Sequence, residues 1–183
     1  MPYFHTDAIN MLFIHIPKTG GTSIEMYFSN RYNVPLNIQS MYSKDGTTKG
    51  VDNNISLQHQ LYRDLYKNRE GYGVAFDRTL KIITIVRNPY ERIISDLFWK
   101  QLISVSSTPD EVYNTIQIYV ADLHSTGGSS YDNHNLHQFE FVLDWDNDNA
   151  LAQDIVILKT ESLTEGMQDL GDARSRVHRL RSC

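Results

Sequence analysis

Two short apolar runs, each followed directly by a turn and a helix-type pattern, constrain the fold of this chain most strongly. The first run, Met11–Ile16, ends at Pro17, and the second, Lys81–Val86, is rich in β-branched residues and is separated from Pro89 by two residues. Each run is too short for a helix and is typical of a strand buried on both faces. Asp154–Leu158 is a third candidate strand.

Helical patterns lie between these candidate strands. A helix is expected to begin near Ser23, a second near Ser56, and a third at Pro89 that continues to about Leu102. A fourth is expected behind the capping box that begins at Thr108. Strands that alternate with helices predict an α/β domain with a central parallel sheet flanked by helices.

The length and composition fit one domain with a packed core. The chain has 183 residues, of which 40% are hydrophobic and 21% are charged, and a domain typically holds roughly 100–200 residues. Four arginines and no acidic residue fall within residues 174–183. We therefore expect a folded domain over residues 1–173 and a basic, disordered tail over residues 174–183.

Several classes of protein are disfavoured by the composition. The single cysteine, Cys183, excludes an internal disulfide framework and a cysteine-based zinc cluster. The formal net charge of −5 argues against nonspecific nucleic-acid binding. No apolar run approaches the roughly 18 residues of a membrane span, and no signal-type segment opens the chain. A cytoplasmic protein is expected on these grounds.

The segment Pro17–Ser23, with the sequence PKTGGTS, has the composition of an anion-binding loop. It lies between a candidate strand and a helix start, where glycines allow backbone N–H groups to turn toward an anion and the helix dipole adds partial positive charge. Lys18 adds a full charge, and Thr22 and Ser23 add hydroxyl donors. Because the lysine precedes the two glycines and none follows them, the spacing differs from the nucleoside-triphosphate loop, and triphosphate binding is disfavoured.

A second anion site is predicted where the second candidate strand ends. Ligands bind outside the carboxyl ends of strands in open α/β sheets, and Arg87 directly follows such a strand. An arginine there is costly unless it meets an anion. Ser95 lies two helical turns beyond the helix start and so returns to the same face. Arg92 could join these two residues, although an ion pair with Glu91 or Asp96 is the favoured interpretation.

The two segments together resemble the cofactor-binding motifs of one enzyme family. Residues 13–23 (FIHIPKTGGTS) resemble the 5′-phosphosulfate loop of sulfotransferases that use 3′-phosphoadenosine 5′-phosphosulfate (PAPS), and residues 85–96 (IVRNPYERIISD) resemble their 3′-phosphate motif. The resemblance points to the glycan branch, similar to the heparan sulfate 2-O- and chondroitin 4-O-sulfotransferases. It implies a P-loop-like three-layer α/β fold.

The resemblance also implies roles for individual residues. Lys18 would stabilise the leaving 5′-phosphate, Arg87 and Ser95 would hold the 3′-phosphate, and His59 would remove the proton of the acceptor hydroxyl. The backbone N–H groups that would hold the 5′-phosphate are those of Thr19, Gly20, Gly21, Thr22 and Ser23. The implied reaction transfers the sulfuryl group of PAPS to a hydroxyl of an acceptor, with a carbohydrate as the expected acceptor, and needs no metal ion.

Two other functions stay open at this point. A small P-loop kinase would share the first loop, but the Gly-Lys-[ST] ending of kinase loops is missing. A non-catalytic module would bind 3′,5′-bisphosphoadenosine and transfer nothing. This second alternative arises because chains of the resembling family usually continue further beyond the strand at residues 155–158.

Other histidines and aromatic residues have weaker claims on function. His134 and His137 could contact the acceptor, or hold a metal ion if their segment were helical, but no acidic third ligand is evident and no metal site is expected. His15 is interpreted as a packed core residue. The aromatic residues expected in the core are Tyr62, Tyr66, Phe98 and Trp99.

Overall fold

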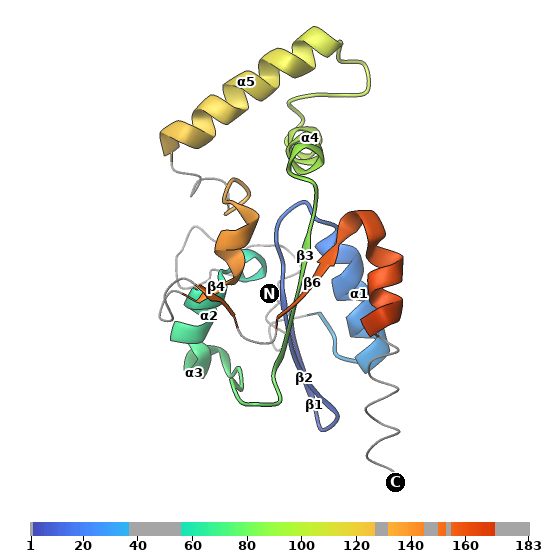
Figure 1. The fold of residues 1–183 in the computed structure, drawn as a ribbon, viewed down its shortest axis with the longest axis vertical. Coiled ribbons are helices and arrows are strands. Elements are labelled where there is room, and N and C mark those ends of the chain that lie inside the picture. Colours follow the sequence, from blue (N-terminus) through green and yellow to red (C-terminus); the bar gives the residue numbers. More distant parts are fainter. Residues whose placement is uncertain (1, 37–55, 127–131, 145–149, 153–154, 171–183) are drawn as a thin grey trace.

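A computed structural model describes residues 2–36, 56–126, 132–144, 150–152 and 155–170 of the chain. Its centre is a four-stranded sheet in the order β1-β2-β3-β6 (Figure 1). The strands are β1 (Tyr3–Thr6), β2 (Ile9–Ile14), β3 (Lys81–Val86) and β6 (Ile155–Lys159). Strands β2, β3 and β6 are parallel, whereas β1 is antiparallel to β2. The predicted α/β class and the parallel centre of the sheet are confirmed.

The antiparallel edge strand β1 was not expected from the sequence and makes the sheet mixed. It forms a hairpin with β2, in which Thr6 pairs with Ile9. Only Tyr3 and Phe4 of this strand are buried, while the two following residues are exposed. Because so short a segment buries only two side chains, its apolar pattern gives almost no signal.

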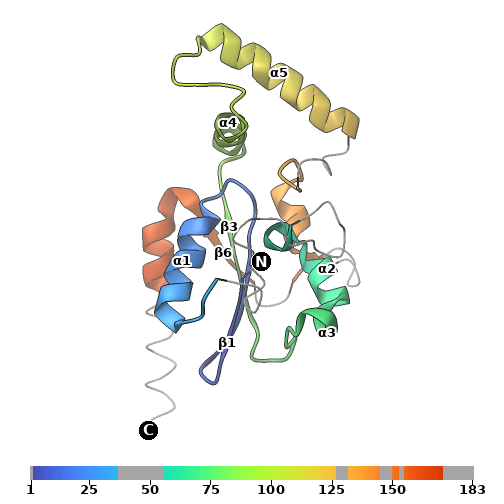
Figure 2. The ribbon, with the colours of Figure 1, turned by 180° about the vertical axis from the view of Figure 1, so that it is seen from behind.

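Helices cover both faces of the sheet and give three layers. α1 (Gly21–Tyr32) and the helical residues 163–170 lie on one face, and α2 (Tyr62–Lys67) and α3 (Arg69–Tyr72) lie on the other (Figures 1 and 2). The smaller elements are η2 (Leu57–His59), η3 (Gln138–Val142), β4 (Leu143–Asp144), β5 (Ala150–Leu151) and η4 (Thr160–Ser162). β4 and β5 form a separate antiparallel pair. Among the described residues, no helix is both long enough and apolar enough to cross a membrane.

The side chains of β2 alternate between the two layers. Met11 and Phe13 belong to the core cluster on the side of α1, and Leu12 and Ile14 belong to the cluster on the side of α2. All six residues of this strand are buried. This burial on both faces explains why the run is apolar without alternation.

Two helices lie beyond the carboxyl ends of the strands, α4 (Pro89–Trp99) and α5 (Pro109–Thr126) (Figure 1). Both predicted starts are confirmed. Asn88 accepts a hydrogen bond from the backbone N–H of Tyr90 at 3.0 Å, and Thr108 and Glu111 form the expected reciprocal capping box. The predicted end of α4 near Leu102 is wrong, because Gln101 has a left-handed φ of 58°.

The prediction of a continuous helix from Ser56 is also wrong for residues 57–61. The structure has the 3₁₀ turn η2 there, then extended backbone at Gln60 and Leu61, and α2 begins only at Tyr62. Asp132 accepts hydrogen bonds from both the backbone N–H and the hydroxyl of Ser56, at 2.6 and 2.9 Å. The serine therefore anchors a distant loop and does not cap a helix.

The start of α1 depends on two glycines and not on the predicted Ser23 cap. Gly20 occupies the N-cap position with a left-handed φ of 86°, a conformation that glycine adopts without a steric penalty. Gly21 packs against His15 so closely that a Cβ atom would lie 2.4 Å from the imidazole ring. His15 is buried, as expected, although its Nδ1 also forms a hydrogen bond with the carboxyl group of Glu25.

The predicted tail at residues 174–183 lies outside the described residues. The domain boundary at residue 173 likewise lies outside them and stays a prediction.

A substitution at Gly21 tests this close approach. We expect Gly21→Ala to lower the free energy of unfolding by about 1–3 kcal/mol, because the added methyl group overpacks the site against His15. Gly71→Ala is the matched control, since a Cβ at this position within α3 meets nothing within 4 Å and alanine is the better helix former. Urea denaturation should show a loss for the first variant only, and equal stability of both would contradict the packing argument.

Candidate functional site

The two predicted anion-binding loops lie side by side because β2 and β3 are parallel neighbours. Ile14 pairs with Thr84, and the hydroxyl of Thr84 donates to the carbonyl of Ile14 at 2.8 Å. The chain leaves both strands at the same edge of the sheet. As a result, Nη1 of Arg87 lies 3.4 Å from the backbone carbonyl of Lys18.

The first loop has the curvature of an anion-binding turn. Lys18 and Gly20 have positive φ angles of 65° and 86°. Thr19 between them is fully buried, and its hydroxyl donates to the carbonyl of Ile16 at 2.8 Å. The loop leads directly into the first turn of α1, where Thr22 and Ser23 are exposed. A curved backbone at a helix start is suited to bind a phosphate or sulfate group.

Lys18 extends from this loop over an aromatic ring. Its Nζ lies 5.4 Å from the ring centroid of Trp99, within the range of a cation–π contact. Burial lowers the pKa of Lys18, and the nearby charge of Arg87 adds to this effect while Asp96 opposes it. Trp99 and Phe98 are 59% and 44% exposed, so the prediction that both belong to the core is wrong. The exposed ring of Trp99 thus lies beside the first anion-binding loop.

Arg87 directly follows β3, and its side-chain contacts with the described residues are long. Nε lies 3.4 Å from Oε2 of Glu91, and the contact to Lys18 is equally long. Its backbone is held firmly, because the amide of Gln138 bonds both the N–H and the carbonyl of Arg87, at 2.9 and 2.8 Å. Charge-assisted hydrogen bonds are usually about 2.7–2.9 Å, so an incoming anion could replace these longer contacts.

Ser95 is not brought into contact with Arg87. It lies in α4 and is half-buried. No hydrogen bond within the described part of the chain joins these two side chains. A shared phosphate site for the pair stays a prediction.

Arg92 has a structural role that was not predicted from the sequence. Its guanidinium donates to the backbone carbonyls of Pro17 at 2.9 Å, His134 at 2.7 Å and Leu136 at 2.9 Å. The favoured ion pair with Glu91 or Asp96 is wrong, since neither appears among the ion pairs of the described residues. Three carbonyl acceptors satisfy this largely buried group and tie the anion-binding loop to residues 134–136.

His59 is buried and forms a pair with a carboxylate. Its Nδ1 lies 2.7 Å from Oδ2 of Asp132, and its backbone carbonyl accepts from the amide of Asn133 at 2.9 Å. Burial lowers the pKa of His59 more strongly than the hydrogen bond to Asp132 raises it. The ring is therefore held in place through Nδ1 and favours its neutral form.

His59 belongs to a row of three buried histidines, each paired with a carboxylate. His15 bonds Glu25, and Nδ1 of His134 lies 2.6 Å from Oδ1 of Asp96. The ring centroid of His59 lies 5.2 Å from that of His15 and 5.1 Å from that of His134. Trp99 stacks on the far member, His134, at 4.6 Å. The row thus links the core to the ring that lies under Lys18.

The carboxylate partners were missed from the sequence. Asp132 stands 73 residues beyond His59, and no local pattern joins two positions so far apart. The sequence signal for a tight turn at this position was the pair Asp132-Asn133. Both residues adopt positive φ, a conformation that Asp and Asn tolerate better than most residue types. His137, which was considered together with His134, caps η3 and lies apart from this cluster.

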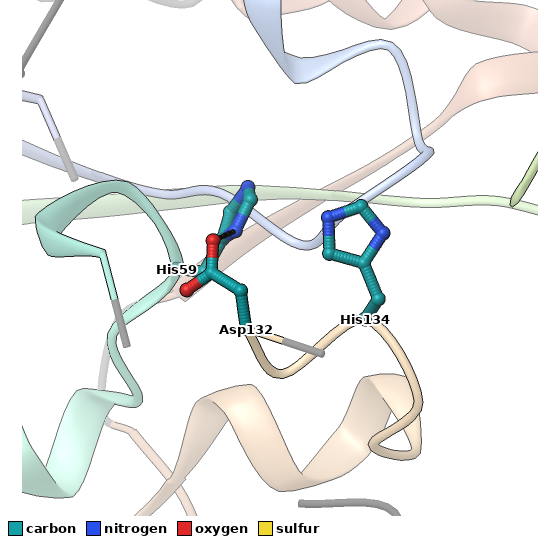
Figure 3. A group of neighbouring side chains, drawn as sticks. All are labelled: His59, Asp132 and His134. Carbon is teal, nitrogen blue, oxygen red and sulfur yellow. Dashed lines mark hydrogen bonds and ion pairs between the residues drawn. The ribbon is translucent and has the colours of Figure 1, made fainter. Parts of the chain in front are cut away.

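The structure brings three possible metal ligands together in a combination not considered from the sequence. One ligand atom from each of His59, Asp132 and His134 lies within 4.8 Å of the others (Figure 3). From the sequence, no acidic third ligand was evident for a metal site at His134. The structure supplies one in Asp132, which lies two positions before His134 in the same loop.

A cavity of about 780 Å³ adjoins the first anion-binding loop. It begins at Ser23 and continues between α1 and the helical residues 163–170. The other residues that line it are Ile24, Tyr27, Arg31, Leu163, Thr164, Met167 and Gln168. Its mixed lining of apolar and polar side chains could contact the rest of a ligand whose phosphate lies in the loop.

Comparison with protein-family models gives one match. A model described as "Sulfotransferase family" matches residues 1–155, a range that includes both anion-binding loops and all three histidine–carboxylate pairs. Searches of curated proteins and of solved structures found no match.

The buried histidines predict a pH dependence of stability. Burial lowers the pKa of His59 and of His134 below the ordinary value of 6.5. Below this value the unfolded chain binds more protons than the folded chain, so the free energy of unfolding falls as the pH decreases. Urea denaturation should therefore show lower stability at about pH 5.5 than at about pH 7.5.

A variant identifies the source of this dependence. His134→Gln should weaken the pH dependence, because one of the buried titrating groups is removed. His124→Gln, at an exposed position on α5, should retain it. Equal pH profiles for both variants would rule out His134 as a contributor.

Proposed function

The chain belongs to the sulfotransferase family, and we propose that it transfers a sulfuryl group from PAPS to a hydroxyl of an acceptor, with a carbohydrate as the favoured class. One observation carries the proposal. Two cationic loops stand on adjacent parallel strands, and a buried histidine–carboxylate pair belongs to the same edge of the sheet. This arrangement combines a site for an anionic donor with a base for an acceptor.

The cationic and N–H groups of the two loops fit a nucleotide with two separate phosphate groups. Lys18 and the start of α1 would hold the 5′-phosphosulfate, and Arg87 would hold the 3′-phosphate. Ser95 is retained as a second ligand of the 3′-phosphate through the family motif. The cavity that begins at Ser23 has room for the nucleoside. When bound, PAPS supplies the activated sulfuryl group.

His59 is the proposed general base. Because Asp132 holds Nδ1, the proton of the neutral ring is directed to that nitrogen and the lone pair of Nε2 remains to accept the hydroxyl proton. The lowered pKa of His59 keeps the ring neutral near neutral pH. Asp132 stabilises the imidazolium that forms once the proton is taken.

Lys18 is proposed to stabilise the charge that develops on the leaving phosphate. Group transfer of this type depends mainly on positioning and on neutralising oxygen atoms. The contact with Trp99 orients the side chain of Lys18. Lys18 and the backbone N–H groups around it would act on the same phosphate.

The exposed aromatic residues support a carbohydrate acceptor. Trp99 lies on His134 and under Lys18, and it keeps 59% of its surface exposed. A flat apolar ring with polar neighbours can pack against the C–H face of a sugar while its hydroxyls reach the polar groups. The acceptor would thereby approach the site from the side of α4.

Isothermal titration calorimetry tests the donor. We expect 3′,5′-bisphosphoadenosine to bind more tightly than ATP, because the two loops match two separate phosphates. Arg87→Ala should weaken this binding by about tenfold or more, the effect of one lost charge-assisted contact. Lys81→Ala, at the opposite end of β3, is the charge-matched control and should bind normally. Tight ATP binding with no response to the bisphosphate would contradict the proposal and favour a kinase.

Transfer of labelled sulfate to a panel of glycans tests the catalytic roles. His59→Asn should lower kcat by about 10²–10⁴-fold, the usual contribution of a general base, and should leave bisphosphate binding intact. Lys18→Ala should also abolish most transfer. Full activity of His59→Asn would exclude this residue as the base, and loss of bisphosphate binding would show that the variant damaged the fold or the donor site.

A further inference from the structure

Three side chains of the reaction centre form a cluster with the composition of a metal site. His59 comes from η2, and Asp132 and His134 come from one loop. Both histidines are buried, and the aspartate is half-buried. Figure 3 shows the His134 ring with one edge turned toward the His59–Asp132 pair.

The distances are close to those that a small divalent ion requires. One ligand atom from each residue lies within 4.8 Å of the other two. Zn²⁺ binds imidazole nitrogen and carboxylate oxygen at about 2.0–2.2 Å, which places tetrahedral ligands roughly 3.3–3.6 Å apart. The His59–Asp132 pair is already closer, at 2.7 Å. None of the distances between the three ligand atoms exceeds 4.8 Å, so binding the ion requires shortening the longest of them by at most about 1.5 Å.

A second layer of hydrogen bonds orients His134 for this role. Because Nδ1 of His134 bonds Asp96 at 2.6 Å, Nε2 is the nitrogen that remains for a ligand. Asp96 is itself fixed by Tyr119 at 2.7 Å and by Lys100 at 3.0 Å. A carboxylate behind a histidine is the usual support of a zinc ligand, because it sets the tautomer and the ring orientation.

We propose that His59, Asp132 and His134 bind Zn²⁺ and that the bound ion blocks sulfuryl transfer. Two imidazoles and one carboxylate leave the fourth position of the ion to water. If the ion binds Nε2 of His59, it takes the lone pair that would accept the hydroxyl proton. If it binds Nδ1, the ring keeps its single proton on Nε2. In either case His59 loses its function as a base, so this blocking effect rests on the proposed function.

Direct binding tests the site without any enzymatic reaction. Zn²⁺ is titrated into the full chain in competition with a chromophoric chelator, and the wild type is compared with His134→Asn and with His124→Asn. We expect His134→Asn to weaken binding by about tenfold or more, as for loss of one ligand, and His124→Asn to bind normally. All three proteins contain Cys183, so an ion held by this thiol contributes equally to each. Equal Zn²⁺ affinity of the three proteins would overturn the proposed site.

Two further measurements keep the test independent of folding defects in the variant. In the wild-type protein, Zn²⁺ should shift the side-chain NMR resonances of His59 and His134 and leave those of His124 unchanged. Asp132→Asn introduces a residue that also tolerates the positive φ of 57° at this position. This variant should also bind Zn²⁺ more weakly than the wild type. Shifts confined to other histidines would overturn the assignment.

Inhibition is then measured with labelled sulfate at increasing free Zn²⁺, with reversal by a chelator. Transfer should fall in proportion to occupancy of the site. Unchanged or increased transfer by the zinc-bound enzyme would overturn the blocking role. If the zinc-free protein transfers nothing to any acceptor, the proposed function fails, while the binding and NMR results still decide whether the metal site exists.

Discussion

The parallel pairing of β2 with β3 is the constraint on which the whole site depends. Because both strands end at the same edge, Lys18 and Arg87 come together although they are far apart in the sequence. The hydroxyl of Thr160, at the end of β6, donates to the carbonyls of Thr19 and Val86. This contact holds both loops to a third parallel strand. The position of the anion site is therefore a property of the sheet and not of either loop alone.

The polar groups behind these loops account for the rigidity of the site. Burying a charged or polar side chain is unfavourable unless hydrogen bonds replace its hydration. Arg92 meets this condition with three backbone carbonyls, and each histidine of the row meets it with a carboxylate. All of these contacts except His15–Glu25 join residues that are 38 to 75 positions apart, such as α4 and the loop at residues 134–136. The same contacts that stabilise the core thus orient the reactive groups.

The histidine–carboxylate pairs also connect the two proposals. A carboxylate that raises the proton affinity of an imidazole raises its affinity for a cation in the same way, because both bind the same lone pair. His59 is therefore suited to accept a proton from a hydroxyl and to bind a metal ion, but not both at once. His134, stacked under Trp99, adds the second nitrogen that would turn a base into a chelating site.

The sequence by itself determined what depends on neighbouring residues: the buried strands, the anion-binding loop from Pro17, Arg87 after a strand, and the caps of α4 and α5. Local sterics and hydrogen bonds decide these features within a few residues, so a pattern can predict them. Only the tertiary structure decided that Asp132 anchors His59, that Arg92 binds carbonyls and that Trp99 stays exposed. These outcomes depend on groups brought together from distant segments, and the physical reason is that a buried polar group takes whichever partner the fold places within hydrogen-bonding distance.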